Sequence, residues 1–115
     1  MSAVFVIGTK YSHGEDELVD MKPQAVGWIL KMVALHLEDS ALAAVLLRQD
    51  DFYWFSLSIF NQAEVRLIVS AIRENLLKEA RAQFLPDFPD SVELIQEFVD
   101  AVNRWAERQD WIYQP

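Results

Sequence analysis

Residues 41–60 of the chain read ALAAVLLRQDDFYWFSLSIF, and the interpretation of this stretch decides the fold. Its second part, residues 52–59, is rich in the aromatic side chains that are typical of strands. Side chains of a strand alternate between its two faces. The alternation predicts a strand with one apolar face, formed by Tyr53, Phe55, Leu57 and Ile59, and a second face, formed by Trp54, Ser56 and Ser58.

Residues 42–48 leave two structures open. They can form a strand that pairs with residues 52–59 across a turn at residues 49–51, or a short helix that Ser40 caps. We favour the hairpin, because aspartates are common in turns, where their side chains accept hydrogen bonds from nearby backbone N–H groups. The Ala43-Ala44 pair counts against a strand, because alanine is depleted in strands.

The chain before this stretch predicts one strand, one loop and one helix. Residues 3–8 are mostly β-branched or aromatic and indicate a short buried strand. Residues 9–21 form the most polar segment and are expected to be a long loop, in which residues 11–20 hold four acids and no base. Pro23 suits the first position of a helix, because the N–H that it lacks would have no partner there. Apolar residues at helical spacing extend this helix over residues 23–38.

The chain after this stretch predicts two further helices. Asn61, followed three residues later by Glu64, approximates a capping box, and the helix that it starts runs to about residue 83. The helix-breaking residues 85–89 end this element. Asp90 is then expected to cap a last helix, which runs to about residue 108. Residues 111–113 form an apolar tail that we expect to dock on the body of the domain.

We therefore predict a single α+β domain over residues 1–115 with the order β-α-β-β-α-α. A small antiparallel-type sheet of about three strands packs against three helices. The alternative is a mainly-α bundle, in which residues 41–48 are helical and residues 52–60 form an irregular apolar segment. Apolar residues make up 52% of the 115 residues, which is enough for a core without a disulfide, and the chain contains no cysteine.

The charge balance restricts the partners of this protein. Eighteen acidic and ten basic residues give a formal net charge of −8. Residues 1–60 hold eight acids and four bases, and residues 61–115 hold ten acids and six bases, so each half carries −4. The absence of a basic patch argues against a nucleic-acid partner. An acidic protein attracts basic partners, whereas the plainer interpretation is that the charge only keeps an apolar domain in solution.

No segment of the sequence predicts export or insertion into a membrane. Residues 1–8 have no basic region, and their apolar run is too short for a signal peptide. The longest apolar stretch, residues 25–37, is shorter than the roughly 20 residues that span a bilayer. We expect a cytoplasmic protein without a membrane partner.

The sequence contains no recognisable arrangement for catalysis or metal binding. His36 lies in the first helix and is interpreted as a partly buried structural residue, and His13 lies in an acidic segment without metal-ligand spacing. The serines lie in no nucleophile pattern, and three glycines leave little room for a phosphate-binding loop. We therefore predict a non-enzymatic protein that uses no cofactor and no metal.

The segment from Asp50 to Trp54 combines acids with aromatic side chains. If Tyr53 and Phe55 face the core, Trp54 faces the opposite side of the strand. Trp and Tyr are enriched in the centres of protein interfaces, so an acidic turn beside exposed aromatics would suit a basic protein partner. The alternative is that helices cover both faces of the sheet and bury these rings.

This profile is similar to that of bacterial toxin-immunity proteins, such as those of contact-dependent growth inhibition systems. The shared features are the chain length, the acidic balance, the absence of cysteine and of a catalytic motif, and the acidic-aromatic segment at residues 50–54. The resemblance implies stoichiometric inhibition, in which acidic side chains cover the basic surface of a cognate toxin, often a nuclease. We expect the partner-binding surface to consist of Asp50, Asp51, Tyr53 and Trp54, together with Glu15, Asp16 and Glu17.

Two other classes of function stay open. A regulatory or adaptor domain, including a homodimer built on an exposed strand edge, would self-associate or present an apolar groove, with little dependence on salt. A small-molecule-binding domain or small enzyme would contain a pocket with convergent polar groups and perturbed pKa values. An immunity protein would instead bind a basic partner and lose it at high salt.

Overall fold

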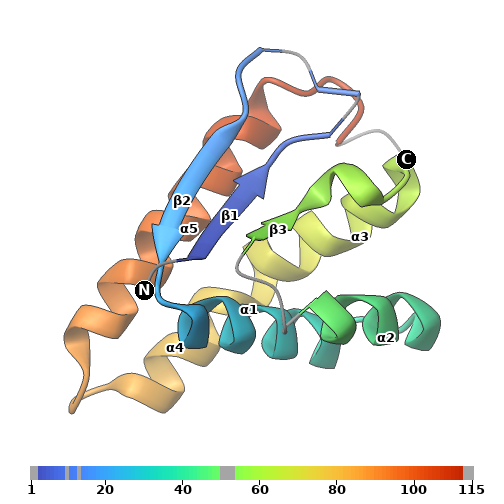
Figure 1. Ribbon diagram of the computed structural model, residues 1–115. Helices are drawn as coiled ribbons and strands as arrows, with labels where there is room; N and C mark the ends of the chain where they lie inside the picture. The colour runs from blue at the N-terminus through green and yellow to red at the C-terminus, as the bar shows by residue number, and fades with distance from the viewer. Residues whose placement is uncertain (1–2, 10, 13, 50–53, 113–115) are drawn as a thin grey trace.

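A computed structural model of the protein describes residues 3–9, 11–12, 14–49 and 54–112. A three-stranded sheet packs against helices, which confirms the predicted α+β class (Figure 1). A 3-10 turn follows the third strand, and a π-helical segment separates the third and fourth helices. In chain order the elements are β1 (Ala3–Ile7), β2 (Glu17–Met21), α1 (Pro23–Leu35), α2 (Ser40–Arg48), β3 (Trp54–Ser56), the 3-10 turn (Leu57–Ile59), α3 (Gln62–Ala71), the π segment (Ile72–Leu76), α4 (Leu77–Phe84) and α5 (Pro89–Glu107).

Strand β1 lies in the middle of the sheet, whose strand order is β2-β1-β3. It pairs antiparallel with β2 and parallel with β3, so the sheet is mixed rather than antiparallel. Successive side chains of β1 point to opposite faces of the sheet. The inner face is buried and carries Ala3, Phe5 and Ile7, whereas the outer face is only partly buried and carries Val4 and Val6.

Strand β2 corrects the prediction of a continuous loop over residues 9–21. Its sequence, ELVDM, pairs with β1 along all five residues. Val19 and Met21 share the inner face with Phe5 of β1, whereas Leu18 and Asp20 lie on the outer face. The alternation was hidden because Glu17 shares the inner face with Val19 and Met21, while the apolar Leu18 lies on the outer face. In the connection that precedes β2, Gly14 adopts a φ of 82°, a conformation that favours glycine.

The predicted hairpin over residues 42–59 is wrong, because residues 40–48 form helix α2. Asp39, rather than Ser40, caps this helix, and its Oδ1 accepts a hydrogen bond from the Leu42 N–H at 3.0 Å. Leu42 and Leu46 lie one helical turn apart, and both are buried. Alanine has the highest helix propensity, so the Ala43-Ala44 pair that weakened the strand favours the helix. The mainly-α alternative is not adopted either, because the sheet is present.

Strand β3 is shorter than predicted and joins the sheet as a parallel strand. Residues 52 and 53 of the expected strand lie outside the described residues. Helices α1 and α2 both lie near the end of the sheet where β2 stops, so the chain enters β3 from that end and runs parallel to β1 (Figure 1). Phe55 and Leu57 are buried as predicted, but Ile59 is 58% exposed, because the 3-10 turn ends the alternation.

The helices of the C-terminal half agree with the prediction. Asn61 Oδ1 accepts a hydrogen bond from the Glu64 N–H at 2.8 Å, and Glu64 Oε1 accepts one from the Asn61 N–H at 3.0 Å, which completes the capping box. The helical segment that follows is continuous over residues 62–84. Helix α5 begins at Pro89, so Asp90 lies in its first turn instead of at the cap. A carboxylate at this place still interacts favourably with the helix dipole.

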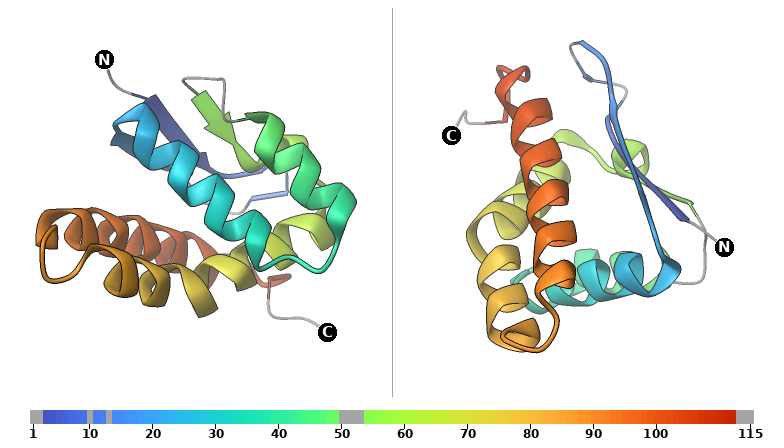
Figure 2. Two further views of the ribbon diagram at one scale, coloured as in Figure 1. Left: turned by 90° about the horizontal axis from the view of Figure 1, so that it is seen from below. Right: turned by 90° about the vertical axis from the view of Figure 1, so that its left-hand side faces the viewer.

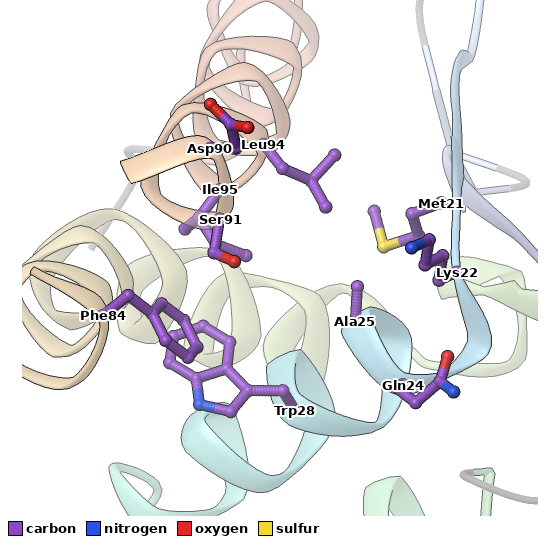
Figure 3. A pocket seen from close by; sticks show the side chains of 10 residues that line it. All are labelled: Met21, Lys22, Gln24, Ala25, Trp28, Phe84, Asp90, Ser91, Leu94 and Ile95. Carbon is purple, nitrogen blue, oxygen red and sulfur yellow. The ribbon is translucent and has the colours of Figure 1, made fainter. Parts of the chain in front are cut away.

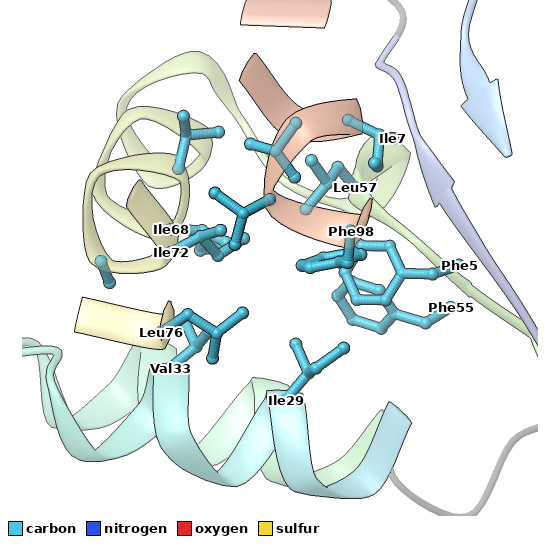
Figure 4. Close-up of a cluster of buried hydrophobic side chains, with 14 of the residues drawn as sticks. Phe5, Ile7, Ile29, Val33, Phe55, Leu57, Ile68, Ile72, Leu76 and Phe98 are labelled. Atoms are coloured by element: carbon cyan, nitrogen blue, oxygen red, sulfur yellow. The ribbon is translucent and has the colours of Figure 1, made fainter. Parts of the chain in front are cut away.

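The hydrophobic core lies between the inner face of the sheet and the helices (Figure 4). The ring of Phe5 contacts Phe55, with centroids 4.6 Å apart, and Phe98 of α5, with centroids 4.7 Å apart. These rings connect the two parallel strands to α5. Aromatic pairs at such distances contribute about 0.5–1.5 kcal/mol each beyond the apolar area that they bury.

The C-terminal tail docks on the body, as the sequence predicts for residues 111 and 112. Trp111 and Ile112 are buried, and the Trp111 ring lies 6.0 Å from that of Trp105. The buried indole of Trp105 donates a hydrogen bond from Nε1 to Ser12 Oγ at 3.2 Å. This contact holds the β1–β2 connection against the end of α5.

The outer face of the sheet is uncovered in the described part of the chain. The helices lie on its inner side or beyond one of its ends (Figure 2). Leu18 on β2 is 68% exposed, and Val4 and Val6 of β1 are only partly buried. The cross-strand register places these three side chains on one face, so they form a small apolar surface.

Candidate partner-binding surface

Glu17 was expected to bind a partner, but its carboxylate is occupied within the protein. Its Oε1 accepts a hydrogen bond from Arg104 Nη2 at 3.0 Å, and its Oε2 accepts one from Arg108 Nη2 at 3.1 Å. The hydrogen bond from Arg104 is the largest cause that lowers the pKa of Glu17. Partial burial opposes this shift, while the hydrogen bond from Arg108 and the positive charges of both arginines add to it. Glu17 therefore fastens the start of β2 to the end of α5.

Glu15 and Asp16 are exposed, but their segment is also held in place. Arg108 Nη2 donates a hydrogen bond to the backbone carbonyl of Glu15 at 2.6 Å. The Asp16 carboxyl group packs so closely against Gly8 that a Cβ at Gly8 would clash with it. Both carboxylates therefore reach solvent from a fixed backbone.

The two parts of the predicted surface lie at opposite edges of the sheet. Glu17 on β2 is opposite Ile7, at one end of β1, whereas Trp54 on β3 is opposite Val4, near the other end. The backbone of β1 separates β2 from β3, and neighbouring strands lie roughly 4.8 Å apart. Asp50, Asp51 and Tyr53 lie outside the described residues, as does the side chain of Trp54. The register thus does not bring Trp54 beside the Glu15–Glu17 segment.

Helix α5 presents an acidic surface that the sequence reasoning missed. It carries four carboxylates at intervals of three, four and three residues, all of them exposed. Residues at this spacing share one face of a helix, and ten residues cover about 15 Å along the axis. In the right-hand view of Figure 2, α5 runs along the face of the molecule that is turned toward the viewer. We name this surface the acidic stripe, and it consists of Asp90, Glu93, Glu97 and Asp100.

The acidic stripe is not neutralised by the described part of the protein. None of its four carboxylates forms an ion pair within the described residues. Asp100 Oδ1 accepts a hydrogen bond from Gln96 Nε2 at 2.9 Å, a neutral donor. Arg104 comes next at the same spacing, but its guanidinium is bound to Glu17. The stripe therefore presents a field of one sign to solvent.

A groove of about 750 Å³ lies beside the acidic stripe. It is bounded by the start of α1, the last residue of α4 and the first turns of α5 (Figure 3). Its rim is polar, with Lys22 and Gln24 at the start of α1 and with Asp90 and Ser91 on α5. Asp90 thus belongs to both the groove and the stripe. The apolar side chains that line the groove are Met21, Ala25, Trp28, Phe84, Leu94 and Ile95.

The aromatic wall of the groove is held in position. The rings of Trp28 and Phe84 lie 5.1 Å apart, and Trp28 Nε1 donates a hydrogen bond to Gln83 Oε1 at 3.0 Å. Gln83 in turn donates to Glu79 Oε2 at 2.9 Å. Only segments distant in sequence form this wall, which explains why no linear pattern indicated it.

The described residues contain no arrangement that suggests metal or membrane chemistry. Among them, no group of three or more His, Cys, Asp or Glu side chains is placed to hold a metal ion. His36 Nε2 lies 3.4 Å from Glu79 Oε1 at the surface, and His13 is outside the described residues. No helix in the same ranges combines the length and the apolar character that crossing a bilayer requires.

The acidic stripe and the groove thus form one candidate surface along α5, with an apolar hollow at one end and a row of carboxylates beside it. Such a surface can bind a chain segment or a protein face that combines apolar and basic side chains. Comparison with known proteins adds no family to this description: no family model, curated protein or solved structure matches the chain.

Proposed function

We propose that this protein is a non-enzymatic, protein-binding inhibitor. In this proposal it acts as an immunity protein that neutralises a cognate bacterial toxin, such as a nuclease, by covering the basic surface of that toxin. The observation that carries the proposal is the acidic stripe, whose carboxylates are exposed and unpaired within the described chain. The exposed Glu15 and Asp16 would add to the same field from beyond the other end of α5.

The arrangement of the stripe supports binding over solubility alone. Where charge serves only to keep a domain in solution, positively and negatively charged side chains are best mixed over the surface. Like charges three and four residues apart on a helix instead destabilise it by about 0.2–0.5 kcal/mol for each pair. A basic partner would remove this repulsion, and its approach would be accelerated by the field of the stripe.

The test is capture of the partner from the source cell by tagged protein, followed by identification of what is bound. We expect one basic protein, bound at low salt and lost at high salt, because screening weakens exposed charge pairs. Expression of that protein alone should arrest growth, and co-expression of this chain should restore it. A captured protein that is not toxic, or that stays bound equally at high salt, would contradict the proposal.

Charge-reversal variants locate the binding surface. Glu93→Lys/Glu97→Lys changes the centre of the stripe, and we expect it to weaken capture of the basic partner at least tenfold. The matched control is Glu38→Lys/Glu74→Lys, which alters the net charge equally at exposed positions outside α5. Equal capture by both variants would rule out the stripe as the binding surface. Circular dichroism of both proteins checks that they remain folded.

A self-associating domain is the second candidate, and the open outer face of the sheet favours it. Leu18 is the most exposed side chain of this apolar surface. A homodimer formed there would bury apolar area and depend little on salt. Sedimentation of the wild type and of Leu18→Glu at 0.05 M and 0.5 M salt tests it. A salt-independent dimer that Leu18→Glu dissociates would support this candidate in place of the inhibitor.

A further inference from the structure

We propose that the groove between α1, α4 and α5 receives apolar side chains of a basic, amphipathic segment of the partner, while its lysines or arginines lie over the acidic stripe. This inference rests on the proposed function, because it identifies the kind of segment that the same surface of α5 would bind. It places the apolar contacts of the interface at the groove and the charge contacts beside it.

The two parts of the surface are adjacent on one helix. Leu94 lines the groove, and it lies four residues after Asp90 and three residues before Glu97. Residues at these spacings are neighbours on a helix surface, so the apolar wall and the acidic row run side by side. A segment with apolar side chains on one face and cations along its border would contact both at once.

The charges around the groove favour a basic occupant. Its rim holds one cation, Lys22, and one carboxylate, Asp90, which lie on opposite sides of the hollow (Figure 3). Beyond Asp90, the stripe adds Glu93, Glu97 and Asp100, and Arg104, which follows at the same spacing, is paired with Glu17 instead. An acidic segment would meet three uncompensated carboxylates, whereas a basic one would neutralise them.

The groove is built to receive apolar side chains with little loss of entropy. Trp28 is half-buried, and its ring is fixed by Phe84 and by the hydrogen bond to Gln83. A partner therefore need not order this side chain when it binds. Two further exposed apolar residues, Leu85 and Phe88, lie in the link between the groove residues of α4 and α5. Exposed apolar surface of this kind marks interaction sites.

The test uses three synthetic 18-residue peptides and the full chain labelled with ¹⁵N. The first peptide is an amphipathic helix of leucine and lysine, the second replaces each leucine with serine, and the third replaces each lysine with glutamate. We expect the Leu/Lys peptide to shift the indole N–H signal of Trp28. It should bind at least tenfold more tightly than either of the other two peptides.

Variants of the groove complete the test. Leu94→Asp places a charge in the groove and Trp28→Ala removes its aromatic wall, so either variant should weaken binding of the Leu/Lys peptide at least tenfold. Two variants are used because one of them can fail to fold. The matched control is Leu35→Asp, which changes a leucine that is 69% exposed and does not line the groove. We expect this control to bind like the wild type.

The outcomes separate this inference from the proposed function. Equal binding of the Leu/Lys and Ser/Lys peptides, or full binding by both groove variants, would overturn the groove inference and leave the stripe intact. Equal binding of the Leu/Glu peptide would overturn the basic character of the occupant. Saturable binding of an apolar dye at Trp28, without binding of any peptide, would assign the groove to a small molecule instead. Equal capture of the partner by Glu93→Lys/Glu97→Lys and by its control would instead rule out the stripe as the binding surface, and a captured protein that is not toxic would overturn the proposed function itself.

Discussion

At the scale of single residues, Glu17 illustrates how tertiary contacts change the role of an acid. In the sequence it belongs to the acidic run of residues 15–17 and is expected to face a partner. In the structure its side chain is only 21% exposed and is bound by Arg104 and Arg108. Charge-assisted hydrogen bonds of this kind are shorter and stronger than neutral ones. Glu17 therefore contributes to folding, whereas Glu15 and Asp16 stay available at the surface.

We expect Glu17→Gln to lower the free energy of unfolding by about 1 kcal/mol at pH 7, since one charged partner is lost from two pairs whose arginines are partly exposed. The folded-state pKa of Glu17 lies below its ordinary value of 4.5. Its stabilisation is therefore complete above pH 4.5 and is lost as the pH falls through the lowered pKa. Urea unfolding of the wild type and of Glu17→Gln between pH 3 and pH 7 measures the difference in their free energies of unfolding. A difference that does not change with pH would contradict the assignment.

Phe5 is the residue on which the packing of sheet against helix depends most directly. Its ring is 1% exposed and touches both Phe55 and Phe98. We expect Phe5→Ala to destabilise the protein by about 3–5 kcal/mol, because it leaves a cavity in the core. Leu35→Ala, at an exposed position, should change stability by less than about 0.5 kcal/mol. Similar effects of the two substitutions in urea unfolding would place Phe5 outside the core.

At the scale of elements, a side-chain cap and two buried leucines determine that residues 40–48 form the helix α2. Its sequence is compatible with a strand in a local hairpin, but the Asp39 side chain satisfies the N–H of Leu42 at the start of the helix. Leu42 and Leu46 then enter the core from one face. The predicted hairpin would contain neither the cap hydrogen bond nor this helical face. In a strand, every second residue would face the core instead.

The two caps considered for α2 can be compared directly. Asp39→Ala should lower the free energy of unfolding by about 1 kcal/mol, because it removes the side-chain acceptor of the cap. Ser40→Ala should have an effect below about 0.5 kcal/mol, since Ser40 is the first residue of the helix and alanine is a better helix former. Thermal or urea unfolding measures both. The reverse order of effects would favour Ser40 as the cap.

At the scale of the whole molecule, the charges are distributed unevenly in space although each half of the sequence carries −4. The arginines at the end of α5 are bound to Glu17, whereas the start and middle of the same helix carry unpaired carboxylates. The groove lies next to these carboxylates. One side of the molecule thus combines an apolar hollow with a negative field, and a partner would meet both together.

Repulsion within the acidic stripe should be measurable in the free protein. Glu93→Gln/Glu97→Gln removes the three neighbouring like-charge pairs of the stripe and keeps side chains of similar helix propensity. We expect this variant to be more stable than the wild type by about 1 kcal/mol at 0.05 M salt. At 0.5 M salt, screening should reduce the difference. Urea unfolding at the two salt concentrations tests this, and a variant less stable than the wild type would show that the stripe stabilises the fold.

The sequence by itself determined the elements that depend on contacts between near neighbours. The capping box of Asn61 and Glu64 spans three residues, and the helical spacing of apolar residues defined the long helices after it. The central strand β1 was likewise recognisable from its β-branched and aromatic residues. These local interactions act in the same way in any tertiary surroundings, so their pattern could be read directly.

Only the tertiary structure decided the remaining features, because they depend on residues distant in the chain. Arg104 lies 87 residues from Glu17, and the pairing with β1 is what turns residues 17–21 into a strand. The placement of α1 and α2 near one end of the sheet makes β3 parallel. The groove is assembled from segments that meet only in the folded state. The spacing of the acidic stripe is present in the sequence but was not recognised there, because only burial of the opposite face of α5 directs these carboxylates to solvent.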